Sequence, residues 1–114
     1  MKPKPVTVAT SAYGADLVRE PGQAYLVPLV ARAGGAGIEI RQELFTAAPP
    51  LESLRDAIAE QGLFAIHSAP LELWQPDGGL AIAALRRARA EAQTLGARFL
   101  KVALGQYVAM LASV

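Results

Sequence analysis

Five side chains able to exchange protons or pair charges sit at alternate positions in short, strand-like stretches of the sequence. They are Glu39, Arg41 and Glu43 in GIEIRQE (37–43), His67 in LFAIH (63–67) and Lys101 in RFLKV (98–102). Carboxylates accept hydrogen bonds, imidazole exchanges protons near neutral pH, and guanidinium and ammonium groups bind phosphates or carboxylates. If the fold brings them together, these residues predict a site for a small polar ligand.

The stretches that carry these residues alternate with helical patterns. Three segments follow one plan, in which a helical pattern leads through a glycine into a short apolar strand, and Gly34, Gly62 and Gly96 are expected to cap the helices. The first helix is expected at about 22–33, where Pro28 predicts a kink or a later start. The second follows Pro49 and Pro50, and the third carries an apolar stripe of Leu85, Ala88, Ala92 and Leu95.

With VTVAT (6–10) added, the strand candidates lie near 6–10, 37–41, 63–67 and 99–104. Strands separated by whole helices are parallel neighbours joined by right-handed crossovers. The sequence therefore predicts an α/β fold with a parallel four-stranded sheet.

One parity of these strands is apolar and the other is polar or small, which predicts helices on only one face of the sheet. The apolar parity reads Val6, Val8, Ile38, Ile40, Phe64, Ile66, Leu100, Val102 and Leu104, and the other Thr7, Ala9, Ser11, Glu39, Arg41, Glu43, Ala65, His67, Phe99, Lys101 and Ala103. In a parallel barrel the polar parity would line an interior pocket. In a two-layer sheet it would be a solvated face, and both alternatives remain open.

Composition limits the classes of function. The 114 residues suit one domain, and a net charge of +1 offers no field to attract nucleic acid or an anionic membrane. The chain has no Cys, no apolar stretch of signal-peptide length at its start and no run long enough to span a membrane. These features predict a soluble cytoplasmic protein.

The stretches GIEIRQELF (37–45) and LFAIHSAPLELW (63–74), within a likeness over about 6–105, carry a family resemblance. The chain resembles the N-terminal half of the xylose isomerase-like TIM barrels, the sugar phosphate isomerase/epimerase superfamily. The resemblance implies that residues 1–105 form half of a TIM (β/α)8 barrel, with 106–114 as an apolar tail or the start of a fourth helix.

The resemblance also implies a function. It points to isomerase or epimerase chemistry on a sugar, sugar phosphate or polyol, with a divalent metal whose ligands lie on the last four strands of the family's barrel and have no counterpart in this chain. The catalytic residues stay unknown, and the chain alone is expected to be inactive. Its partners would be the small-molecule substrate and either further copies of itself or a missing C-terminal half.

In a barrel, the polar parity makes Glu39, Arg41, Glu43, His67 and Lys101 one wall of a pocket, and the resemblance adds Trp74, so these six residues are the expected substrate contacts. Each has a structural alternative: His67 as a satisfied core histidine, Trp74 as a cover over the sheet end, and Lys101 as a partner of Glu39 or Glu43. His67 also fits one zinc position of the related DNA-repair endonucleases, but a single histidine makes no metal site. The arginines at 86, 87 and 89 are expected to form a solvated helix face.

Three functions follow as hypotheses. The first is a sugar isomerase or epimerase of which this chain supplies the substrate-side half. The second is a non-catalytic or truncated half-barrel that self-associates or binds a small ligand. The third is an abasic-site endonuclease relative, for which the near-neutral charge is unfavourable.

Overall fold

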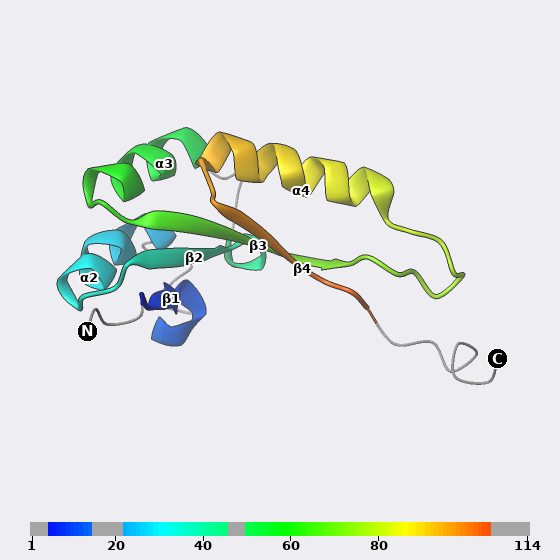
Figure 1. Ribbon diagram of the computed structural model, residues 1–114, viewed down its shortest axis with the longest axis horizontal. Helices are drawn as coiled ribbons and strands as arrows, with labels where there is room; N and C mark the ends of the chain where they lie inside the picture. Colours follow the sequence, from blue (N-terminus) through cyan, green and yellow to red (C-terminus); the bar gives the residue numbers. More distant parts are fainter. Residues whose placement is uncertain (1–4, 15–21, 46–49, 106–114) are drawn as a thin grey trace.

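A computed structural model describes residues 5–14, 22–45 and 50–105 of the chain. They form an α/β domain with a four-stranded, all-parallel sheet in the order β1-β2-β3-β4 (Figure 1). The strands are β1 (Thr7–Ala9), β2 (Gly37–Arg41), β3 (Phe64–Glu72) and β4 (Phe99–Ala103), and the helices α2 (Val27–Arg32), α3 (Leu51–Glu60) and α4 (Ile82–Leu95). Short 3-10 turns η1 (Thr10–Tyr13), η2 (Gln23–Leu26) and η3 (Gln42–Leu44) flank them. The predicted parallel four-stranded sheet is confirmed.

The helix boundaries follow from local chemistry. Pro28 lies in the first turn of α2, where its missing N–H costs no hydrogen bond, so the helix starts late, after η2, as the proline predicted. Gly34, Gly62 and Gly96 all have positive φ (88°, 69° and 71°), which confirms their predicted role as helix-ending residues.

The hydrophobic core lies between the sheet and its three helices. It joins apolar side chains from one face of the sheet to the inner faces of α2, α3 and α4. Its buried members are Val27, Val30, Ile38, Ile40, Leu54, Ile58, Ala65 and Leu95. Figure 1 shows α3 and α4 on the same side of the sheet. The other face, which we call the free face, carries none of these helices.

The register corrects the predicted parity of β3. Ile38 lies beside Ala65 and Ile40 beside His67, and neighbours in a parallel sheet point to the same face. Ala65 and His67 are therefore on the helix-covered face, and Phe64 and Ile66 are on the free face, the reverse of the prediction. The small side chain of Ala65 fits in the core beneath the helices, while the Phe64 ring lies across Gly37, which has no side chain there.

β3 is longer than predicted and continues into an arm. The loop after it turns back at Gly78, and Trp74 forms an antiparallel bridge with Leu80. The backbone N–H of Trp74 also donates to the carbonyl of Leu104 at 2.9 Å. In Figure 1 this loop reaches away from α2 and α3 before the chain returns to α4.

The predicted apolar tail or fourth helix at 106–114 lies outside the described residues. Within the described ranges, no helix is long and apolar enough to cross a membrane.

Candidate functional site

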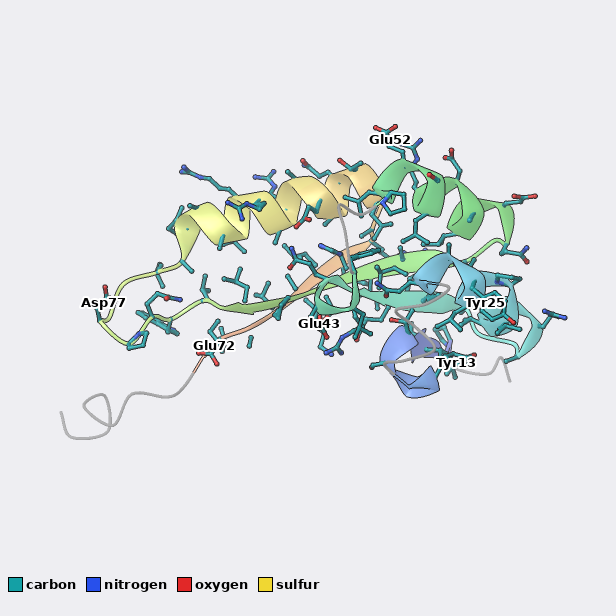
Figure 2. All side chains as sticks on the ribbon, turned by 180° about the vertical axis from the view of Figure 1, so that it is seen from behind. Tyr13, Tyr25, Glu43, Glu52, Glu72 and Asp77 are labelled. Atoms are coloured by element: carbon teal, nitrogen blue, oxygen red, sulfur yellow. The ribbon has the colours of Figure 1, made fainter. Side chains whose placement is uncertain are left out.

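Four charged side chains form one connected cluster on the free face. The guanidinium of Arg41 donates from Nη1 to Glu39 Oε2 at 2.9 Å and from Nε to Glu43 Oε1 at 2.8 Å. Lys101 Nζ donates to the other oxygen of Glu39 at 3.3 Å. Figure 2 shows Glu43 on the side of the sheet away from α3 and α4. The predicted convergence of Glu39, Arg41, Glu43 and Lys101 on the face without helices is confirmed.

The cluster is partly shielded from water and electrically balanced. Glu39 is only 8% exposed, and both of its oxygens accept charge-assisted hydrogen bonds. The hydrogen bond to Glu43, followed by the one to Glu39, raises the pKa of Arg41, although burial opposes the rise. Lys101 is the most exposed member, and its ion pair with Glu39 confirms the structural alternative that its sequence position suggested.

Gln23 fixes the end of β2 that carries Arg41. Its buried side chain accepts from the backbone N–H of Arg41 at 2.8 Å and donates to the Arg41 carbonyl at 2.9 Å. The hydroxyl of Thr10, also buried, donates to the same amide oxygen at 2.7 Å. The Gln23 amide thus links the turn after β1 to the last residue of β2. It fixes the position of the Arg41 backbone, from which the guanidinium extends.

Three residues in register form the rim of a hollow. Arg41, Ser68 and Lys101 stand side by side on β2, β3 and β4. They line a hollow of about 220 Å³ together with Ala69, Pro70, Val102 and Ala103. The hollow lies toward the carboxyl ends of the strands and offers a guanidinium, a hydroxyl and an ammonium group, all of which donate hydrogen bonds. It is small for a drug-sized ligand but suits a sugar-sized one or a phosphate group.

The opposite end of the free face is apolar. Phe64 and Ile66 of β3 are half-buried, and Phe99 of β4 is 58% exposed beside Ile66. The guanidinium of Arg98 stacks over the Phe64 ring at 4.1 Å. Along the strands the free face therefore changes from apolar side chains to the charged cluster.

The structure places His67 away from this cluster, so the prediction that it shares a wall with Glu39, Arg41 and Lys101 is wrong. The imidazole is fully buried on the helix-covered face, and neither ring nitrogen has a hydrogen-bond partner among the described residues. Its Nε2 lies 3.8 Å from Glu91 Oε1 of α4, and that oxygen already accepts from Gln42 at 2.8 Å. Burial lowers the pKa of His67, and the negative charge of Glu91 offsets this only in part.

Trp74 also lies apart from the cluster. It follows the end of β3, where its backbone N–H bonds to Leu104, three residues after Lys101, and it does not line the hollow. Its ring is 43% exposed in the arm. The described residues thus bring four of the six predicted contact residues together and leave His67 and Trp74 elsewhere.

The donor set on the free face does not fit a divalent metal. Within the described ranges, no three His, Cys, Asp or Glu residues lie close enough to hold one ion. Glu39 and Glu43, the two acids of the cluster, are each paired with Arg41.

Two polar residues of the site were not predicted. Ser68 lies just beyond the strand predicted near 63–67, but β3 continues through it and places it between Arg41 and Lys101. Gln23 carries no motif, and its role depends on contacts with residues 13 and 18 positions away in the sequence. The register of β2 against β3 would have identified Ser68, but no local pattern identifies Gln23.

No protein-family model matches the sequence, and a search of curated proteins finds no match either.

Proposed function

We propose that this chain supplies the substrate-side wall of a sugar-handling (β/α) barrel of the isomerase or epimerase type, with the free face as its inner wall. The observation that carries the proposal is the row of Arg41, Ser68 and Lys101, which crosses three parallel strands level with the carboxyl end of β2, on the face that the helices leave open. Ligand sites of parallel α/β barrels lie at this end of the strands.

The order of side chains along the free face favours a barrel wall over a solvated sheet. The end away from the cluster carries the apolar side chains of Phe64, Ile66 and Phe99, and the one charged group there, the Arg98 guanidinium, stacks on the Phe64 ring. Parallel barrels are filled by apolar layers below and carry polar groups at the mouth. Further strands packed over this face would bury Phe99 and Ile66, which explains why apolar side chains lie here.

The charged cluster suits a polyhydroxylated ligand with an anionic group. Glu39 and Glu43 can accept hydrogen bonds from hydroxyl groups, and Ser68 can donate one. Among the described residues Lys101 is held only by its 3.3 Å contact with Glu39, and it is largely exposed, so it can turn toward a phosphate at small cost. Arg41 is fixed by two carboxylates and by Gln23 and serves as the rigid part of the site.

The test is calorimetric binding of fructose 6-phosphate to the 114-residue chain, with sorbitol as an uncharged polyol. We expect Arg41→Ala to weaken phosphate-sugar binding by about 10- to 100-fold, because it removes charge-assisted hydrogen bonds. Lys101→Ala should weaken it by a smaller factor. Arg87→Ala, on the exposed face of α4, is the matched control and should leave affinity unchanged.

Equal affinities in all four proteins, or no binding to the wild-type chain, would contradict the proposal. A turnover assay adds a second test. Binding without turnover is what both a substrate-side wall and a non-catalytic binding module predict, whereas aldose–ketose interconversion by the chain would contradict both and support an enzyme that works without further strands.

A further inference from the structure

Both edges of the sheet are open strands within the described residues. β1 and β4 each pair on one side only, with β2 and β3 respectively. An open edge presents unpaired N–H and C=O groups and readily pairs with another strand. The sheet therefore has two unpartnered edges that run in the same direction.

The free face beside the β4 edge also lacks a cover. Phe99 is 58% exposed on the free face of this edge strand. Within the cluster, the charges of Arg41 and Lys101 balance those of Glu39 and Glu43, and at the other end the Arg98 guanidinium stacks on the Phe64 ring. The clusters of two copies can therefore approach each other without net repulsion, and a second free face would bury the apolar end.

We propose that two copies of this chain associate about a two-fold axis parallel to their strands, with β4 of each copy beside β1 of the other. Rotation about such an axis preserves strand direction, so both new pairs are parallel, like the three pairs within the chain. Both edges of each copy are then paired in one closed eight-stranded sheet. The two free faces line a common interior, and each Arg41–Ser68–Lys101 row gains its facing wall from the partner.

This geometry differs from the simplest alternative dimer. A two-fold axis perpendicular to the strands would pair β4 of one copy with β4 of the other, and these two strands would be antiparallel. That arrangement leaves β1 open and Phe99 uncovered. The proposed dimer depends on the edges and on the apolar end of the free face, and not on the ligand proposed above.

The first experiment is sedimentation equilibrium of the 114-residue chain over about 1–200 μM. We expect a mass twice the 12.0 kDa of one chain. Phe99→Glu should raise the dimer dissociation constant by at least about 100-fold, because it places a charge in the closed interior. In the monomer this position is exposed, so the variant should still fold.

Leu80→Glu is the matched control, since Leu80 is 47% exposed but lies in the arm, away from both edges. It should leave the mass unchanged. Hydrogen exchange then tests the geometry: amides of both β1 and β4 should exchange slowly in the dimer and faster in Phe99→Glu.

A 12.0 kDa monomer at every concentration would overturn the proposal, and the free face would then need another cover, such as further strands of a longer chain. A dimer that Leu80→Glu dissociates, or one that protects β4 while β1 exchanges rapidly, would overturn it as well. Because none of these readouts involves a ligand, the proposed function can fail or succeed independently.

Discussion

The two faces of the sheet are built from alternate residues of the same strands, but they differ in whether their polar side chains have partners. On the free face, Arg41 and Lys101 are paired with carboxylates within 3.3 Å. On the helix-covered face, His67 is fully buried with no hydrogen-bond partner among the described residues. We infer that the helix-covered face maintains the fold and that the free face is arranged to meet a ligand.

The largest expected contrast comes from neighbouring residues on β2. Ile40→Ala, on the helix-covered face, should lower the free energy of unfolding by about 3 kcal/mol, because it leaves a cavity in the core. Arg41→Ala, one residue later on the free face, should lower it by about 1 kcal/mol, since Glu39 keeps its contact with Lys101. Urea denaturation of both variants measures the difference, and equal losses would show that the two faces do not differ in this way.

His67 should make stability depend on pH. Well above about pH 6.5, the ordinary pKa of histidine, the imidazole is neutral in both the folded and the unfolded chain, so this group adds no pH dependence there. As the pH falls below that value, the unfolded chain binds a proton that the buried imidazole resists, because burial lowers its pKa. The melting temperature should therefore fall between pH 7 and pH 5.

Two variants sharpen this prediction. His67→Leu should flatten the pH dependence, because it removes the titrating group and fills a similar volume. Glu91→Gln should steepen it, since the charge that partly supports the imidazolium is lost. A wild-type melting temperature that is constant from pH 7 to pH 5 would mean that His67 is not buried as described.

The smallest expected effect on stability is that of Lys101. Its side chain is 60% exposed, so Lys101→Ala should change the free energy of unfolding by no more than about 0.5 kcal/mol. The same variant should weaken binding of fructose 6-phosphate. A clear loss of stability with unchanged binding would assign Lys101 to the fold and remove it from the site.

Much of the fold could be predicted because its signals are local. The strand at 37–41 and the capping glycines at 34, 62 and 96 depend on neighbouring residues, and all were predicted correctly. Which side chains of β3 face the helices could not be predicted from neighbouring residues. Phe64 and Ile66 are more apolar than Ala65 and His67 and were assigned to the core, but the register with β2 places the other pair on the helix-covered face.

The same distinction between local sequence signals and tertiary contacts applies to the candidate site. Glu39, Arg41 and Glu43 alternate on one strand and its exit, so their common side follows from sequence alone. The positions of Ser68, His67 and Gln23 depend on register and on contacts between distant segments. The corrected register replaces His67 with Ser68 in the row beside Arg41.

The most direct test of the central claim, that the free face binds the ligand, is a titration of the isotope-labelled chain with fructose 6-phosphate followed by NMR. The account predicts that chemical-shift changes concentrate on the amides of Arg41, Ser68 and Lys101 and on the side-chain Nε–H of Arg41, while Glu91 and the arm around Trp74 stay unchanged. Shift changes confined to the helix-covered face or to the arm, or none at all, would contradict it.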